Sequence, residues 1–276
     1  MAMIEIDNLM KRFGTAVAVD HVSFNVDRGE VLGFLGPNGA GKSTLIGILC
    51  SLVTKTTGTV EIFGHNISSD FSKAKSCLGV VPQEFNFNIF ETPLQIIRNQ
   101  AGYYGIKRSI ALKQAEKYIK LVGLWDKKDT CANDLSGGMK RRLMIARALV
   151  HEPKILILDE PTAGVDVENR LSMWSFLREI NAKGITIILT THYLDEAENL
   201  CRSIGIINDG HIIENTSMKD LLGRLNVQTY IFELASPITE IPHTLTDSSK
   251  LIDTTTVEVT IPVSYTHLTL PTNREV

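Results

Sequence analysis

The order of hydrophobic and polar positions predicts strands that alternate with helices along most of the chain. Short apolar runs of strand length occur at Val31–Leu35, Ile155–Leu158 and Ile185–Leu189, and residues 168–182 have helical spacing between the last two. Strands of a parallel sheet, buried on both faces, have such continuous apolar runs. We therefore expect an α/β fold with a parallel sheet covered by helices on both faces.

Two regions depart from this alternation. Met3–Ile6 and Val22–Val26 alternate apolar and polar residues, as strands with one buried face do. From residue 84 to about 132 the spacing becomes helical, with one helical face made of Leu112, Ala115, Ile119 and Val122. We expect an antiparallel β region and a helical region beside the parallel sheet.

The last fifth of the chain has a weaker pattern. Asp209-Gly210 lies between two short apolar runs and predicts a β-hairpin. Beyond residue 223 we expect strands at Tyr230–Leu234 and Thr256–Ile261. The chain then ends in PVSYTHLTLPTNREV, which resembles translated adapter sequence. The expected ranges are therefore 1–222 for the main domain, 223–261 for a partial extension and 262–276 for a non-native tail.

Composition narrows the class of protein. With 28 Lys and Arg against 31 Asp and Glu in 276 residues, the formal charge is −3, which argues against a broad basic surface for nucleic acid. No apolar run approaches the roughly 18 residues of a membrane-spanning helix. The four cysteines form no CxxC pair, so a disulfide scaffold and a zinc site are both disfavoured. We expect a soluble protein of a reducing, cytoplasmic compartment.

A glycine-rich stretch joins the run Val31–Leu35 to an apolar run of helical character at Leu45–Leu52. It reads Gly36-Pro37-Asn38-Gly39-Ala40-Gly41-Lys42-Ser43-Thr44 and contains the phosphate-loop pattern G-x-x-x-x-G-K-[ST]. In such a loop the amide N–H groups and the following helix N-terminus face nucleotide phosphates. Lys42 adds a positive charge, and the Ser43 hydroxyl suits a Mg²⁺ ligand. The alternative is a chance strand–helix turn, which the flanking pattern disfavours.

The apolar run Ile155–Leu158 ends in two carboxylates. Asp159 suits a contact to Mg²⁺, directly or through water, beside the phosphates. Glu160 suits the general base that accepts a proton from the attacking water. The alternative is a buried strand whose exposed end carries two acids. The phosphate loop upstream favours the catalytic interpretation.

Five motifs follow one another along the chain. They are the phosphate loop, Gln83 after an apolar strand, Leu135-Ser136-Gly137-Gly138-Met139, the run that ends in Asp159-Glu160, and His192 after another apolar strand. In this order they resemble the nucleotide-binding domain of ABC ATPases, over roughly residues 4–222. The resemblance implies a P-loop NTPase core, an antiparallel β subdomain, a helical subdomain at about residues 84–150 and a small C-terminal extension containing β-strands.

The resemblance also implies a dimer. In this family two nucleotide-binding domains face head to tail, and each ATP lies between one subunit's phosphate loop and the other's Ser136, Gly137 and Gly138. Those three residues would bind the γ-phosphate from the start of a helix. One copy of each motif makes half of each site, so we expect ATP, Mg²⁺ and a homodimer together.

The resemblance implies roles for four other residues. Gln83 would reach Mg²⁺ or the attacking water, and His192 would contact the γ-phosphate. Asp166 would lie in a loop that crosses the dimer interface, and Phe13 would stack on adenine. Taken alone, Gln83 is an ordinary strand-end residue, a lone histidine is more often structural, and Phe13 is equally suited to a core.

Three classes of protein compete for these motifs. Soluble ABC proteins of translation usually carry two such domains in one chain, and those of DNA repair insert a coiled coil, whereas Gly36–Asp159 has no sustained heptads. Other P-loop enzymes, such as kinases and GTPases, do not explain LSGGM or His192. The ATPase subunit of a membrane transporter is favoured, and a soluble ABC ATPase not coupled to transport is the alternative.

Longer stretches narrow the resemblance further. VPQEFNFNIFET, QAGYYG, LSGGMKRRLMIARAL and TTHYLDEAE are similar to YadG-like subunits of the ABC-2 export group. This implies a separate ABC-2-type permease, at the cytoplasmic face of the bacterial inner membrane. An aromatic set falls where the family receives a helix of the permease, namely Phe85, Phe87, Phe90, Tyr103 and Tyr104. The alternative is that these rings form the core of the helical subdomain.

Overall fold

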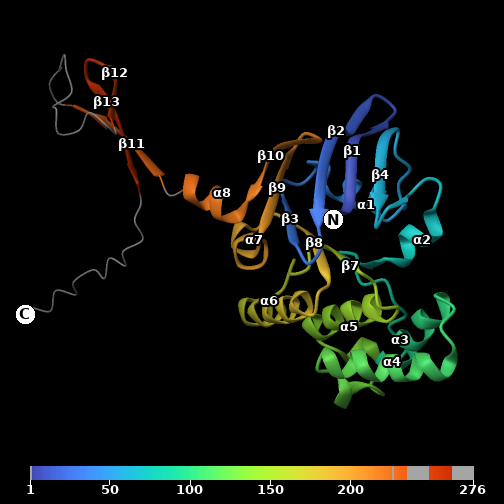
Figure 1. The fold of residues 1–276 in the computed structure, drawn as a ribbon. Helices are drawn as coiled ribbons and strands as arrows, with labels where there is room; N and C mark the ends of the chain where they lie inside the picture. Colours follow the sequence, from blue (N-terminus) through green and yellow to red (C-terminus); the bar gives the residue numbers. More distant parts are fainter. Residues whose placement is uncertain (1, 226, 235–248, 263–276) are drawn as a thin grey trace, which may run out of the picture. The chain divides into compact units, whose positions relative to one another are not determined.

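The computed structural model describes residues 2–225, 227–234 and 249–262 (Figure 1). The chain divides into two units, Met1–Met218 and Lys219–Val276. In the part described, the first unit contains two sheets with their helices and the second contains one small sheet. The expected non-native tail lies outside the described residues apart from Pro262, and the expected range boundaries stay predictions.

The larger sheet of the first unit is parallel except at one edge. Its strands lie in the order β10 (His211–Ser217), β9 (Ser203–Asn208), β3 (Val31–Leu35), β8 (Thr186–Thr191), β7 (Ile155–Asp159) and β6 (Leu78–Val81). Only β10 runs antiparallel to its neighbour. It turns back through Asp209 and Gly210, whose φ angles are 46° and 80°, which confirms the predicted hairpin.

Helices pack on this sheet and account for its apolar strands. The four apolar residues of β7 are fully buried, and so are all six residues of β8. The helices around them are α1 (Lys42–Leu49), α5 (Gly137–Leu149), α6 (Val167–Ala182) and α7 (Leu194–Leu200). The expected α/β fold and its parallel sheet are confirmed.

The second sheet of this unit is antiparallel, in the order β2 (Ala16–Asp27), β1 (Ala2–Phe13), β4 (Thr57–Ile62) and β5 (His65–Asn66). One hydrophobic core joins it to α1 and the parallel sheet. Phe24 of β2 meets Phe34 of β3 edge to face, with ring centroids 5.0 Å apart. Both β1 and β2 are longer than the alternation predicted, because bulges let main-chain pairing continue where the side-chain pattern breaks.

The helical region holds α3 (Pro93–Tyr103) and α4 (Arg108–Leu121). In Figure 1 the helix α5 lies between these two helices and the sheet, and it packs against both helices and against β6. The predicted buried face of α4 was partly wrong. Ala115, Ile119 and Val122 are buried as predicted, but Leu112 is 40% exposed, because the buried face also includes Ala111 and Tyr118 and Leu112 lies at its edge.

The second unit is described in part. Its strands β11 (Val227–Glu233), β13 (Thr256–Pro262) and β12 (Ser249–Asp253) pair antiparallel in that order. Two of them match the predicted strands, and β12 was missed. Among the described residues, no helix has both the length and the apolar character needed to cross a bilayer.

Candidate nucleotide-binding and hydrolysis site

The phosphate loop connects β3 to α1, where two glycines are required by close approach of other main chain. A Cβ on Gly36 would lie 2.2 Å from the carbonyl oxygen of Ile207. Gly41 has a φ of +105°, and a Cβ there would lie 2.3 Å from the carbonyl oxygen of Ala18. The loop is therefore pressed against β9 and β2, and no other residue fits at either position.

Lys42 lies inside this loop. It is only 5% exposed, and its Nζ donates to the carbonyl oxygens of Gly36 at 2.7 Å and Pro37 at 2.9 Å. Burial lowers the pKa of Lys42, and the nearby charges of Glu160 and Asp159 oppose that shift. The loop lines a pocket of about 340 Å³. A buried cation at the carboxyl end of a parallel strand is a suitable anion site.

Thr190 of β8 holds the two carboxylates that follow β7. Its hydroxyl donates to the Asp159 carboxylate and accepts from the main-chain N–H of Glu160 at 3.0 Å. Glu160 itself has a φ of 45°, a conformation that costs about 1 kcal/mol in a residue with a Cβ. The pairing of β7 with β8 therefore fixes the backbone turn that directs the Glu160 side chain.

Three predicted catalytic residues meet at Glu160. The Gln83 Nε2 donates to one carboxylate oxygen at 3.0 Å, and the His192 Nδ1 lies 3.2 Å from the other. The Glu160 side chain is 13% exposed and that of His192 is 35% exposed. The three residues follow β6, β7 and β8, so the carboxyl ends of neighbouring strands bring them together.

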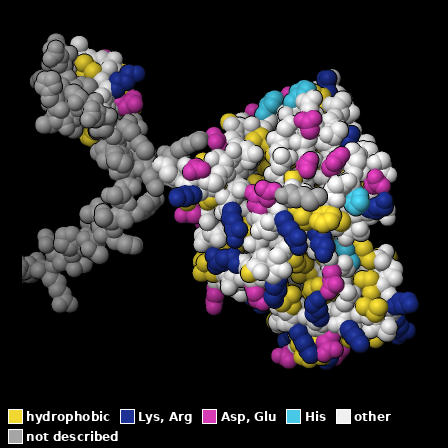
Figure 2. All heavy atoms as spheres, in the orientation of Figure 1, with side chains coloured by type: hydrophobic (Ala, Val, Ile, Leu, Met, Phe, Trp, Pro, Cys, Tyr) yellow, Lys and Arg dark blue, Asp and Glu magenta, His cyan; other side chains and the backbone are white. Residues whose placement is uncertain are grey.

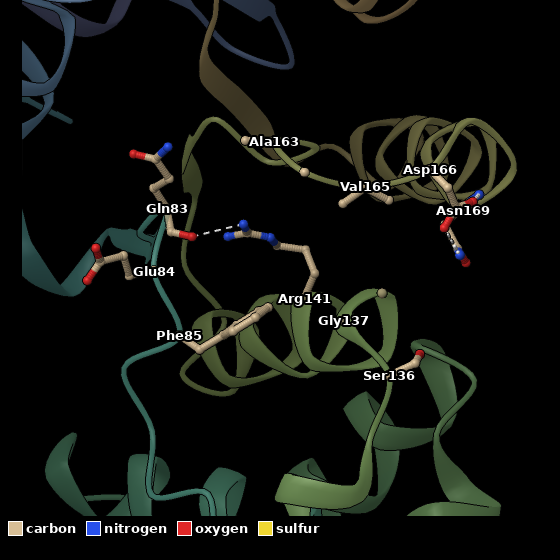
Figure 3. A pocket seen from close by; sticks show the side chains of 12 residues that line it. Gln83, Glu84, Phe85, Ser136, Gly137, Arg141, Ala163, Val165, Asp166 and Asn169 are labelled. Atoms are coloured by element: carbon tan, nitrogen blue, oxygen red, sulfur yellow. Dashed lines mark hydrogen bonds between the residues drawn. The ribbon is translucent and has the colours of Figure 1, made fainter.

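The residues Ser136, Gly137 and Gly138 lie apart from the phosphate loop, in a second pocket of about 690 Å³ (Figure 3). The Ser136 hydroxyl caps α5 by accepting from the N–H of Met139 at 3.3 Å. The start of α5, the Gln83–Phe85 segment and the Ala163–Asp166 loop line this pocket. Gln83 is the residue common to the linings of the two pockets.

Asp166 caps α6. Its carboxylate accepts from the Asn169 N–H at 3.0 Å and from the Asn169 Nδ2 at 2.7 Å, and these hydrogen bonds lower the pKa of Asp166. The Asn169 side chain also lies close to the Ser136–Gly138 segment: a Cβ on Gly138 would lie 3.3 Å from the Asn169 Oδ1. Asp166 is thus exposed at the second pocket, beside the start of α5.

Phe13 lies at the end of β1 and is 52% exposed, so it is not a core side chain. The Nζ of Lys11 lies 4.5 Å from the centre of its ring. Phe13 pairs with Ala16 in β2, two residues before Ala18, which lines the phosphate-loop pocket. The ring is available to a ligand from this side.

Sequence reasoning missed the residues that anchor these motifs. The carboxylate of Glu196 is 1% exposed and accepts from the Thr162 hydroxyl at 2.7 Å and the Trp174 Nε1 at 3.3 Å. Arg141 is 4% exposed and binds the Gln83 segment. Neither residue has a sequence signal, since a buried Arg or Glu on a helix has the same spacing as an exposed one. Thr190 does have a sequence signal, because it is a polar residue directly after a run of apolar ones.

These arrangements define a P-loop nucleotide-binding cassette in which the phosphate loop and the Ser136–Gly138 segment line different pockets. The family model described as ABC transporter matches residues 19–163. The chain is 38% identical over 238 residues to the linearmycin resistance ATP-binding protein LnrL of Bacillus subtilis, covering 86% of this chain and 76% of that protein. It is 40% identical to the Nod factor export ATP-binding protein I of Burkholderia lata, covering 77% and 70% respectively.

Solved structures of ATP-binding cassettes have a similar fold. The fold is similar to cbiO1 from Clostridium perfringens, part of the ABC transporter complex cbiONQ, with a TM-score of 0.74, 28% identity, and 80% of this chain and 90% of that chain covered. It is also similar to the ATP-binding cassette MJ0796 in a dimeric post-hydrolysis state bound to ADP and Pi, with a TM-score of 0.69, 27% identity, and 78% and 99% covered.

The chain belongs to the ABC transporter family. It is an ATP-binding subunit and an ATPase, as the motif order predicted, and the expected ABC ATPase fold is confirmed. Subunits of this family dimerise and work with transmembrane partners.

Proposed function

We propose that this subunit powers export through a separate, ABC-2-type permease at the cytoplasmic face of the inner membrane, as YadG-like subunits do. Export is supported by relatives named for Nod factor export and linearmycin resistance. The observation that carries the mechanism is the separation of the two pockets within one subunit. A nucleotide on the phosphate loop then needs a second subunit to supply Ser136–Gly138.

Binding of ATP begins at the phosphate loop. Lys42 exchanges its bonds to the carbonyls of Gly36 and Pro37 for the β- and γ-phosphate oxygens. The main-chain N–H groups of the loop and the positive end of α1 add donors, and these N–H groups belong to Gly36, Asn38, Gly39, Ala40, Gly41, Ser43 and Thr44. Pro37 has no N–H and contributes only its fixed backbone angle to the turn. Phe13, exposed beyond the loop, stacks on the adenine.

The residues near the phosphates suit Mg²⁺. Ser43, Asp159 and Gln83 offer hydroxyl, carboxylate and amide oxygens, the hard donors that Mg²⁺ prefers. Within the described residues, no group of three or more His, Cys, Asp or Glu could hold a metal by itself. A few protein oxygens completed by phosphate and water are the usual arrangement for this ion. When bound, Mg²⁺ polarises the phosphoryl oxygens.

Glu160 is the general base in this mechanism. Its carboxylate accepts the proton of the attacking water as the γ-phosphoryl group is transferred. Gln83 and His192, at 3.0 Å and 3.2 Å, hold the two oxygens of that carboxylate in place. Once ATP is bound, both side chains are positioned to turn toward the attacking water and the γ-phosphate.

The second subunit completes the site. The N-terminus of its α5, with Ser136, Gly137 and Gly138, faces the γ-phosphate across the interface, and its Asp166 lies beside it. ATP therefore stabilises the closed dimer, and loss of phosphate opens it. This change in the interface is the movement that a permease would use.

The docking surface for the permease is the aromatic set of the helical region. Phe85, Phe90 and Tyr103 are 43%, 80% and 86% exposed, so they are not core residues. Figure 2 shows hydrophobic patches among Lys and Arg side chains over α3–α5, in the lower part of the face. A pocket of about 550 Å³, lined in part by Phe71, Tyr103 and Tyr104, opens beside α3. Exposed rings beside a pocket suit an apolar helix of a membrane subunit.

The experiment that tests this function uses Glu160→Gln. The amide cannot accept the proton, so the variant should bind ATP, hydrolyse it at least about 100-fold more slowly and accumulate as a closed dimer. Sedimentation with and without Mg-ATP measures the dimer. The matched control, Glu160→Gln with Lys42→Ala, should stay monomeric because it cannot hold the γ-phosphate. A Glu160→Gln variant that stays monomeric and turns over normally contradicts the proposed site.

A further inference from the structure

The Gln83 segment is held from the helix that carries the second pocket. The guanidinium of Arg141, on α5, donates through Nη1 to the carbonyl oxygen of Pro82 and through Nη2 to that of Gln83, each at 2.9 Å. Figure 3 shows the Arg141 side chain reaching from α5 to the Gln83 main chain, while the Gln83 side chain points the other way. The main chain of Gln83 is thus fixed and its amide remains free to bind Glu160 at 3.0 Å.

Other contacts make this attachment stiff. The guanidinium lies over the Phe85 ring, 5.3 Å from its centre. Two turns further along α5, Arg147 donates to the carbonyl oxygen of Asn86 at 3.0 Å. One helix therefore binds the segment at three of its carbonyl groups.

The choice of arginine has a physical reason. Arg141 is 4% exposed, and burial lowers its pKa, while the charges of Asp159 and Glu196 oppose the shift. The guanidinium reaches the two carbonyls through two separate nitrogens and presents a flat face to the Phe85 ring, whereas a lysine would have to reach both carbonyls from one nitrogen. Lysine at this position would keep the positive charge but lose the contact that two nitrogens make with the carbonyls of Pro82 and Gln83.

We propose that Arg141 is a positioning residue for hydrolysis, which holds Gln83 against Glu160 and links that contact rigidly to the Ser136–Gly138 end of α5. Arg141 follows Gly138 by three residues, about one helical turn. The same short piece of helix thus faces the partner's γ-phosphate at its start and sets the subunit's own catalytic contact one turn later. The proposal rests on the roles given above to Gln83 and Glu160.

The test is a double-mutant cycle in the full-length protein with Arg141→Lys, Gln83→Ala and both together. Arg141→Lys should lower kcat about 10- to 100-fold, because a small displacement of Gln83 misplaces the base. The dissociation constant for ADP should change less than about twofold, because the side chain does not touch the phosphate loop. In the Gln83→Ala background, Arg141→Lys should lower kcat by less than about twofold, since there is no amide left to position.

Controls separate this role from folding and from charge. Lys113→Gln, which removes an exposed charge from α4, should leave kcat and ADP binding unchanged. Circular dichroism should show Arg141→Lys folded at the assay temperature, and Arg141→Gln should lower kcat at least as much as Arg141→Lys.

The outcomes are distinguishable. Additive losses in the double variant, or a wild-type kcat for Arg141→Lys, overturn the role of Arg141 and leave the proposed site intact. A large loss of ADP affinity in Arg141→Lys assigns it a general structural role and also overturns the inference. A wild-type kcat for Gln83→Ala removes the proposed role of Gln83, and the inference fails with it.

Discussion

The two elements proposed to bind phosphate, the phosphate loop and the Ser136–Gly138 segment, are built differently in this subunit. The phosphate loop is packed against β2 and β9, and its lysine is 5% exposed and bonded to the loop's own carbonyls. The Ser136–Gly138 element lies at the start of α5, with Ser136 and Gly137 exposed at an open pocket of about 690 Å³. The first element is organised before any ligand arrives, whereas the second presents its donors outward. This difference suits the proposed site shared between two subunits.

The largest effect on ATPase activity is expected from a substitution in the phosphate loop. Lys42→Ala removes the only full positive charge in the sequence of the phosphate loop, so ATPase activity should fall by about 10³-fold or more. Steady-state phosphate release measures the loss, and circular dichroism checks that the fold is kept. Activity within about tenfold of wild type would mean that the loop is not where the reacting phosphates bind.

An effect nearly as large is expected at the outward-facing element. A Cβ on Gly137 meets no atom within 4 Å, so Gly137→Asp should fold normally and place a negative charge opposite the partner's γ-phosphate. ADP affinity of the isolated subunit should be unchanged, while kcat should fall about 100-fold. Equal losses of ADP affinity in Gly137→Asp and Lys42→Ala would show that the two elements act on one nucleotide within one subunit.

The sharpest comparison comes from mixing these two inactive variants. In a head-to-tail dimer, a Lys42→Ala subunit paired with a Gly137→Asp subunit contains one fully intact composite site. A mixture should therefore recover activity, up to about a quarter of the wild-type value, if the variants exchange freely. A mixture as inactive as its components contradicts a site shared between subunits.

The smallest effect, on the pH dependence of stability, is expected at His151, which lies in neither element. Its ring stacks on Tyr104 with centroids 3.7 Å apart, and its Nε2 lies 2.8 Å from the carbonyl oxygen of Leu78. Burial lowers the pKa of His151, so the unfolded chain binds a proton near pH 6.5 that the folded chain does not. Stability contributed by the neutral ring is present above that pH and is lost as the pH falls below it.

Urea unfolding at pH 7.5 and 5.5 measures this loss. The free energy of unfolding should decrease by at most about 1 kcal/mol through this group, and His151→Phe should show less of that pH dependence. ATP turnover at pH 7.5 should be the same in both proteins. An equal pH dependence in wild type and His151→Phe would show that other groups cause it.

The structure brings together most of the residues that the short motifs single out. Lys42, Asp159 and Glu160 are each placed by a strand end that the apolar pattern already predicts, and His192 and Gln83 converge on Glu160 through neighbouring parallel strands. The prediction failed at Leu112, which lies at the exposed edge of an otherwise correctly predicted helical face, and at β12, whose pattern is too weak to recognise. The aromatic set was open between core and surface, and the structure divides it: Phe85, Phe90 and Tyr103 are exposed, whereas Phe87 and Tyr104 are half-buried.

The sequence by itself determined the phosphate loop, the carboxylates and their order, because these functions need particular residue types at particular spacings on the chain. The tertiary structure alone decided that Thr190 holds the two carboxylates, that Arg141 holds the main chain of Gln83, and that Gln83 lines both pockets. The physical reason is the separation along the chain of the residues that interact. A phosphate loop is a local conformation, whereas these anchors act between segments that lie far apart in the chain and meet only when the sheet forms.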